Sequence, residues 1–147
     1  MVSYNFKMKI LILILLLFSL TTNATEKDTL TYLFMGHTYQ WGSGGNRVDQ
    51  RLENIDFSDF DGIWLGGDIC SEASLNYATL KYIDDLFDLG NPNNHWTLGN
   101  HDIRNGNLEW IEEFTERPTY YASYNKGITT VVLNANLSPL DCENIDK

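Results

Sequence analysis

Positive charge is scarce in this 147-residue sequence, which has 10 Lys and Arg residues against 20 Asp and Glu residues and a formal net charge of −10. Proteins that bind nucleic acids without sequence preference neutralise phosphates with Lys and Arg side chains. The shortage of these residues therefore argues against a nucleic-acid partner. A small phosphate ester remains an acceptable ligand, because bound cations can reverse the local field at an acidic site.

Long apolar runs are also missing, because the run at residues 10–18 is shorter than the ~20 residues that a membrane span requires. Lys7 and Lys9 precede this run and a small polar segment follows it, which is the pattern of a secretory signal peptide. We expect residues 1–24 to be removed after Ala24 and the remainder, with a formal charge of −12, to be exported to the periplasm or secreted. An uncleaved membrane anchor is the alternative; no Cys follows the run to suggest a lipoprotein.

Cysteine is limited to Cys70 and Cys142. Export would allow a disulfide between them to persist, but the sequence does not show that they approach each other, so their pairing stays open. Internal repeats, low-complexity tracts and linkers are absent after residue 25. The whole chain has 43% hydrophobic and 13% aromatic residues, enough to form a core, and we expect the segment 25–147 to be part of one folded domain.

Short apolar runs that end in glycine alternate with segments of helical pattern along this domain. The runs at residues 29–36, 62–65 and 95–98 predict strands, and the hairpin signal at 125–127 predicts paired strands at 119–124 and 128–134. Helices are predicted at 75–89 and 108–114, with weaker helical character at 48–55. Asn107 is the expected N-cap of the helix at 108–114. This order predicts an α/β fold with a largely parallel sheet and helices on its face.

Polar residues follow each of the three predicted parallel strands. They are Gly36-His37, Gly67-Asp68 and Asn100-His101-Asp102, and the spacings of 31 and 32 residues each fit one crossover. Ligands of such sheets gather beyond the carboxyl ends of the strands. We therefore expect the three clusters to converge at one edge of the sheet.

The second and third of these clusters resemble two sequence blocks of the calcineurin-like metallophosphoesterases. The resemblance rests on Gly-Gly-Asp at 66–68 and on the more specific Gly-Asn-His-Asp at 99–102, and it covers residues 30–137. It implies a layered α/β/β/α sandwich, of which this chain would supply the first sheet and part of the second. It also implies hydrolysis of small phosphomonoesters or phosphodiesters.

The resemblance implies roles for individual residues. Asp68 would bridge two divalent metal ions, and Asn100 would bind one of them. Mn, Fe and Zn all suit such ligands. Two bridged ions can hold a hydroxide that attacks phosphorus in line. His101 would stabilise or protonate the leaving-group oxygen, and Asp102 would orient its imidazole.

The chain departs from the family pattern in two places. The first block is normally Asp-x-His, and here it is Met35-Gly36-His37, so His37 matches the ligand histidine while a thioether replaces the carboxylate. Either another carboxylate replaces the missing ligand of the first metal ion, or that ion is held weakly, or the protein uses one metal ion. The family's later histidine ligands would follow Asn136, yet the only histidines are His37, His95 and His101. We therefore expect an N-terminal fragment of a longer enzyme, inactive by itself.

Other interpretations of these residues remain open. Asp68 can be a turn residue, and residues 100–102 can form an Asx-type turn. The first rival function is a noncatalytic binding module with a degenerate metal site. The second is nucleotide binding by the glycine-rich loop 42–45, although Arg47 stands where the dinucleotide fingerprint needs glycine. Within that loop region Arg47 and Trp41 are possible substrate contacts. His95 is expected to be a structural or surface residue.

Overall fold

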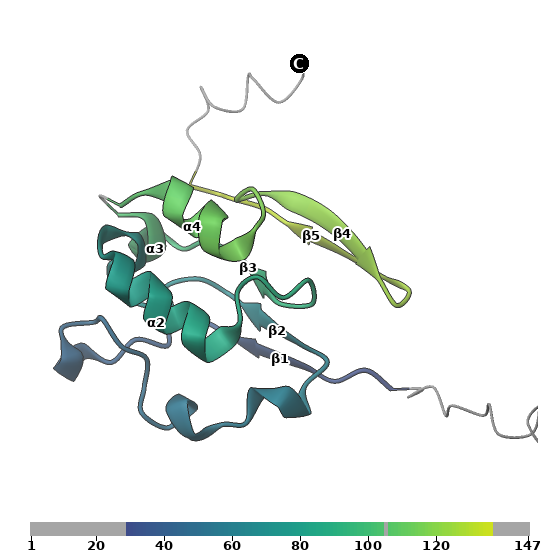
Figure 1. Cartoon of the computed structure of the whole chain (residues 1–147), viewed down its shortest axis with the longest axis horizontal. Helices are drawn as coiled ribbons and strands as arrows, with labels where there is room; N and C mark the ends of the chain where they lie inside the picture. The colour runs from purple at the N-terminus through teal and green to yellow at the C-terminus, as the bar shows by residue number, and fades with distance from the viewer. Residues whose placement is uncertain (1–28, 105, 137–147) are drawn as a thin grey trace, which may run out of the picture. The chain divides into compact units, whose positions relative to one another are not determined.

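The computed structural model describes residues 29–104 and 106–136, so the predicted signal peptide and Cys142 lie outside the described part (Figure 1). The fold is of mixed α/β type. Strands β1 (Tyr32–Met35), β2 (Gly62–Leu65) and β3 (His95–Trp96) form a parallel sheet in the order β1-β2-β3. Tyr32 pairs with Gly62 and Trp64 pairs with His95 in its register. The prediction of a parallel sheet is confirmed.

The middle strand explains where the core lies. Ile63 and Leu65 of β2 are 3% and 2% exposed, whereas Phe34 of the edge strand β1 is 70% exposed. Helix α2 (Tyr77–Phe87) contributes Leu80 and Ile83, both 0% exposed, to the same cluster. Their spacing of three residues places them on one face of the helix. Burial of these aliphatic side chains between α2 and the sheet is the main source of the fold's stability.

Both predicted helices that flank β3 are present. Helix α2 begins after Asn76, whose side chain accepts a hydrogen bond from the Ala78 N–H and caps the helix. Helix α4 (Leu108–Thr115) packs against α2, and Asn107 is its N-cap residue as predicted, although the Asn107 side chain makes no capping hydrogen bond. None of the helices in the described part is long and apolar enough to cross a membrane.

The predicted hairpin is confirmed as β4 (Tyr121–Asn125) and β5 (Ile128–Val132), an antiparallel pair. Its turn consists of Lys126 and Gly127, with φ angles of 48° and 83°. Two consecutive residues with positive φ form the turn type that matches the twist of a two-residue hairpin. The Tyr121 hydroxyl lies 2.9 Å from Nδ1 of His95, which joins the hairpin to the parallel sheet.

The helical character predicted for residues 48–55 is wrong. Val48 forms an antiparallel bridge with Tyr39, and the Asp49 side chain accepts a hydrogen bond from the Arg51 N–H. These contacts use backbone groups that a helix would need, and Asp side chains commonly compete with helices in this way. Only a short 3-10 turn, Leu52–Asn54, remains. The connection from β1 to β2 therefore contains loops and 3-10 turns, not an α-helix.

Candidate functional site

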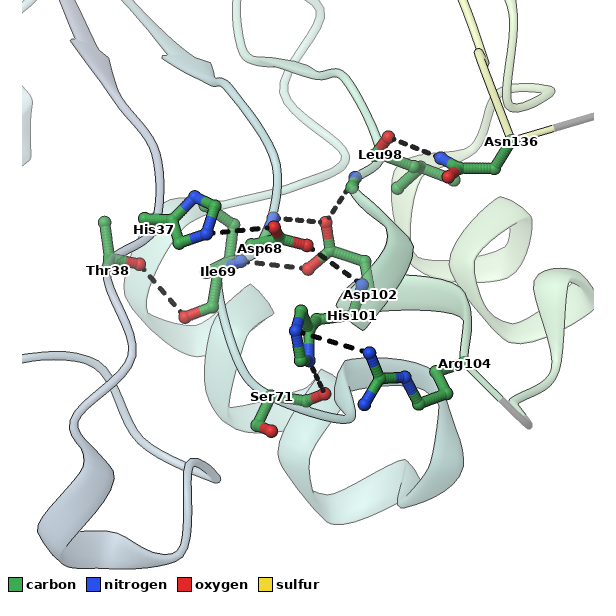
Figure 2. Close-up of polar contacts among 11 residues, drawn as sticks. His37, Thr38, Asp68, Ile69, Ser71, Leu98, His101, Asp102, Arg104 and Asn136 are labelled. Atoms are coloured by element: carbon green, nitrogen blue, oxygen red, sulfur yellow. Dashed lines mark hydrogen bonds and ion pairs between the residues drawn. The ribbon is translucent and has the colours of Figure 1, made fainter.

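The loops that follow β1 and β2 bring His37 and Asp68 together, and Figure 2 shows their side chains facing each other. Nε2 of His37 lies 3.2 Å from Oδ2 of Asp68. The backbone adds a second connection, since the His37 N–H donates to the Gly67 carbonyl at 2.9 Å. The His37 side chain is 71% exposed and that of Asp68 is 9% exposed. The site therefore has a buried carboxylate and an imidazole open to solvent.

His37 and Asp68 also share an unusual backbone conformation. Their φ angles are 52° and 53°, which is the left-handed region that residues with a Cβ seldom occupy. Such strain costs about 1 to 3 kcal/mol at each residue and persists only where surrounding contacts enforce it. Residues strained in this way cluster at functional sites. The two loops thus combine close side chains with stored backbone strain.

Asp102 enforces the conformation of the loop after β2. Its carboxylate is fully buried and accepts hydrogen bonds from three backbone N–H groups, those of Gly99 at 2.8 Å, Asp68 at 2.7 Å and Ile69 at 2.9 Å. Burial raises the pKa of Asp102 to about 6, the backbone N–H donors oppose that rise, and the negative charge of Asp68 adds to it. The carboxylate therefore connects the loop after β2 to helix α3 (Asn100–Ile103).

The expectation that Asp102 orients the His101 imidazole is wrong. Nδ1 of His101 lies 3.0 Å from the carbonyl oxygen of Ser71, while the Asp102 oxygens are bonded to backbone N–H groups. A carbonyl oxygen can only accept, so we infer that Nδ1 carries the proton and that the lone pair of Nε2 can accept a hydrogen bond. Arg104 approaches this Nε2 with a guanidinium nitrogen at 3.4 Å. The loop after β2 thus orients the imidazole through its backbone.

Asp68 connects the three strand ends. One of its oxygens, Oδ1, accepts the His101 N–H at 2.9 Å, while Oδ2 faces His37. The predicted convergence of the clusters that contain these three residues is therefore observed. Gly99 is required at this point because a Cβ there would collide with the Asp68 carboxylate. The glycines of these motifs provide the space in which the polar groups meet.

The remaining predicted residues differ in their surroundings. Asn100 is exposed at the start of α3, and its side chain makes no hydrogen bond to any other described residue. Met35 pairs with Leu65 in the register of β1 and β2 and packs against the hydrophobic core. His95 lies buried in β3, and burial, with a smaller contribution from the charge of Arg117, lowers the pKa of its imidazole. Its bond to Tyr121 agrees with the structural role expected for it.

Cys70 lies behind the loop after β2 and is fully buried. Burial, and secondarily the charge of Asp102, raises the pKa of its thiol to about 12. A thiol of this kind is inert, because thiolate is the reactive form. The possible pairing with Cys142 involves a residue outside the described part and stays a prediction.

Sequence reasoning missed Tyr39. Its ring centroid lies 5.9 Å from that of His37 and 5.7 Å from that of His101, so the tyrosine contacts both imidazoles. The only signal in the sequence is an aromatic residue two positions after His37. That signal is weak, because the antiparallel bridge to Val48 that positions Tyr39 depends on a loop closure that the sequence does not reveal.

The donor atoms partly fit a divalent cation. Two ligand atoms at about 2.1 Å from one metal lie roughly 3.0 to 3.4 Å from each other at octahedral or tetrahedral angles. The 3.2 Å between His37 Nε2 and Asp68 Oδ2 falls in this range. Within residues 29–104 and 106–136, however, no group of three His, Cys, Asp or Glu side chains is placed to hold one metal. Any further ligands must come from the Asn100 amide, from solvent or from groups outside the described residues.

Comparison with known proteins gives no relative from which a function can be transferred. No protein-family model, no curated protein and no solved structure matches this chain.

Proposed function

We propose that the full-length protein is an exported, metal-dependent phosphoesterase of the calcineurin-like type, and that this chain supplies the N-terminal half of its catalytic domain. The observation that carries the proposal is the position of Asp68. Its two oxygens contact groups from the other two strand ends, at 3.2 Å from His37 Nε2 and 2.9 Å from the His101 backbone nitrogen. Three loops that are consecutive along the sheet thus share one carboxylate.

In this proposal His37, Asp68 and Asn100 hold the divalent ions. When bound, such ions supply a hydroxide nucleophile at neutral pH and neutralise charge on the phosphate. The chain prepares for this in two ways. The bond from the His101 N–H fixes Oδ1 of Asp68, which leaves Oδ2 directed toward His37. The bond from the Asp68 N–H to Asp102 fixes the backbone from which the carboxylate extends.

His101 is the residue proposed to act on the leaving group. Its Nδ1–H is directed at the Ser71 carbonyl, so proton exchange with a substrate takes place at Nε2. A protonated Nε2 can donate a hydrogen bond or a proton to the departing oxygen. The Arg104 guanidinium, 3.4 Å from that nitrogen, adds positive charge beside a phosphate in a protein of net charge −10.

The wider assignment follows from this site. Residues 1–24 are proposed to be a signal peptide that directs the enzyme to the periplasm or the medium. The β4–β5 hairpin, which forms a sheet separate from β1–β3, is proposed to begin the second sheet of an α/β/β/α sandwich. The histidine ligands that complete a two-metal centre are proposed to follow this chain in the reading frame.

Hydrolysis of p-nitrophenyl phosphate and bis(p-nitrophenyl) phosphate by the full-length protein, with Mn²⁺ or Zn²⁺ added, tests the proposal. Asp68→Asn and His101→Ala should each lower kcat/KM by about a hundredfold or more. Asn at position 68 can still accept the His101 N–H, so the loss would come from the missing charge. Asp85→Asn removes an exposed carboxylate paired with Lys81 on α2 and is the matched control. Unchanged hydrolysis in both site variants would refute the mechanism.

A noncatalytic binding module is the second candidate, and the position of Met35 favours it. This side chain packs against the core where the family has a ligand carboxylate, which removes one donor from the site. Metal analysis of the purified full-length protein separates the two functions. The enzyme requires at least one tightly bound metal ion per chain, whereas a value below one favours the binding module.

A further inference from the structure

An exposed tryptophan stands beside the candidate site. Trp41 is 72% exposed and begins the 3-10 turn Trp41–Ser43 in the loop after β1. Large aromatic side chains contribute most when they are buried, so their exposure in a surface loop is a common feature of binding surfaces. The indole is not left to rotate freely, because it packs edge-on against Tyr39 with ring centroids 5.0 Å apart and an interplanar angle of 85°.

The loop that carries Trp41 has an ordered stem. The antiparallel bridge between Tyr39 and Val48 closes it, and the Gln40 N–H donates to the Arg47 carbonyl at 2.8 Å. At the tip, the Gly44 N–H donates to the Trp41 carbonyl at 3.1 Å. The loop returns to Val48 and does not lead into a helix, so it lacks the helix N-terminus with which glycine-rich loops bind phosphates. A phosphate-binding role for residues 42–45 is therefore not supported.

The same loop is connected to His101 through one residue. The Ser71 N–H donates to the Gly45 carbonyl at 2.7 Å, and the Ser71 carbonyl lies 3.0 Å from His101 Nδ1. Gly45 is buried, has a φ of 78°, and has no room for a Cβ because the Ser71 Cβ occupies that space. The positions of the tryptophan turn and of the imidazole are thus fixed against a common residue.

The rings form a continuous series. Tyr39 contacts the imidazole of His101 on one side and the indole of Trp41 on another, with centroid distances of 5.7 and 5.0 Å. A group leaving from a phosphate beside His101 would therefore meet an aromatic surface that begins at Tyr39 and ends at the solvent-exposed Trp41. We propose that Trp41 and Tyr39 bind the planar aromatic or heteroaromatic leaving group of the phosphate ester that this site hydrolyses.

This inference rests on the proposed phosphoesterase function and adds the substrate class to it. An aromatic pair contributes about 0.5 to 1.5 kcal/mol beyond the area that it buries, which corresponds to roughly a 2- to 13-fold effect on binding. Loss of the indole should therefore weaken the use of aryl esters selectively. Alkyl esters, which offer no ring, should be little affected.

The experiment compares Trp41→Ala with the unmodified full-length protein on phenyl phosphate and on glycerol 2-phosphate. Each substrate is compared with itself, so the different reactivity of the two leaving groups cancels. We expect kcat/KM to fall about three- to tenfold for phenyl phosphate and less than about twofold for glycerol 2-phosphate. Tyr124→Ala removes an aromatic side chain that is 74% exposed at the far end of β4, and it should change neither value.

Binding of phenylphosphonate and methylphosphonate, which are not hydrolysed, separates this inference from the proposed function. If neither ester is hydrolysed but Trp41→Ala weakens phenylphosphonate binding alone, the catalytic proposal fails and the aromatic site stands. If the esters are hydrolysed and Trp41→Ala lowers both kcat/KM values equally or leaves both unchanged, the aromatic site is refuted and catalysis stands. If the protein neither binds the phosphonates nor hydrolyses the esters, the catalytic proposal and the aromatic site are both refuted.

Discussion

The loops at the ends of the parallel strands and the β4–β5 hairpin both contain residues with positive φ, but for different reasons. In the hairpin, Lys126 adopts a φ of 48° because a two-residue turn requires it. At the strand ends, His37 and Asp68 have positive φ angles although neither lies in a hydrogen-bonded turn. Those angles are maintained by hydrogen bonds from distant segments, such as the one that joins the Asp68 N–H to Asp102.

The two regions also differ in what they expose. The strand-end loops expose the His37 imidazole but bury two carboxylates that accept backbone hydrogen bonds, with Asp102 fully buried and Asp68 6% exposed. The hairpin exposes apolar side chains, including Val131 at 61%. The difference indicates that the strand-end region is organised around buried polar contacts, and we expect the exposed positions of the hairpin to tolerate substitution. Mutations should therefore have large effects in the first region and position-dependent, mostly small effects in the second.

The largest effect is expected from Asp102→Ala. This change leaves three backbone N–H groups without their acceptor, and each of the two buried ones, those of Asp68 and Ile69, costs about 1 to 3 kcal/mol. We expect the free energy of unfolding, measured by urea denaturation, to fall by about 3 kcal/mol or more. Asp85→Ala, which removes an exposed carboxylate, should change it by less than about 0.5 kcal/mol. A loss below about 1 kcal/mol for Asp102→Ala would show that these bonds do not organise the loop.

A smaller but specific effect is expected from Gly99→Ala. The backbone angle at Gly99 is ordinary, so the only obstacle is the collision of the new Cβ with the Asp68 carboxylate. Forcing an atom into such a space costs about 1 to 3 kcal/mol. Gly42→Ala is the matched control, because a Cβ there meets no atom within 4 Å. Equal unfolding midpoints for the two variants would contradict the close packing around Asp68.

His95, which joins the parallel sheet to the hairpin, should make the stability of the protein depend on pH. Burial lowers the pKa of His95 below its ordinary value of 6.5. As the pH falls through that value, the unfolded chain takes up a proton that the folded chain does not, so stability decreases. His95 should therefore contribute a fall in the urea midpoint between about pH 7.5 and about pH 5, whereas Asp102, whose pKa is raised to about 6 in the folded chain, opposes that fall. His95→Gln removes only the first contribution, so its midpoint should rise relative to that of the unmodified protein as the pH falls. An identical pH dependence in His95→Gln would assign the effect to other groups.

The smallest effects are expected in the hairpin, where two adjacent residues of β5 can be compared. Val131→Thr replaces a side chain that is 61% exposed and should change the free energy of unfolding by less than about 0.5 kcal/mol. Val132→Thr puts a hydroxyl at a site that is 2% exposed and should cost about 1 to 3 kcal/mol. Comparable losses at both positions would mean that the exposed face of β5 is covered in solution.

The sequence predicted the parts of the structure that depend on local patterns. Apolar runs ending in glycine identified all three parallel strands, and the Lys126-Gly127 turn identified the hairpin. The convergence of His37, Asp68 and the segment 100–102 followed from the geometry of parallel strands, in which carboxyl ends meet at one edge.

The predictions that were wrong concern residues whose contacts are with residues far away in the chain. The resemblance implies that Asp102 orients the His101 imidazole, but the partners of its carboxylate include the N–H groups of Asp68 and Ile69, more than 30 residues away. Val48 was given helical character, whereas its pairing with Tyr39 determines its conformation. Neither hydrogen bonds from backbone N–H groups nor the closure of a loop changes the periodicity of side chains, so the sequence pattern does not reveal them.

We propose that His37 and Asp68 bind one divalent cation together at the strand ends. The most direct test is a crystal structure of the full-length protein grown with Mn²⁺, with the metal located by anomalous scattering. We expect an anomalous peak at about 2.2 Å from both His37 Nε2 and Asp68 Oδ2. The proposal would be contradicted by a map without a peak at that position, in which the imidazole and the carboxylate keep their direct 3.2 Å contact.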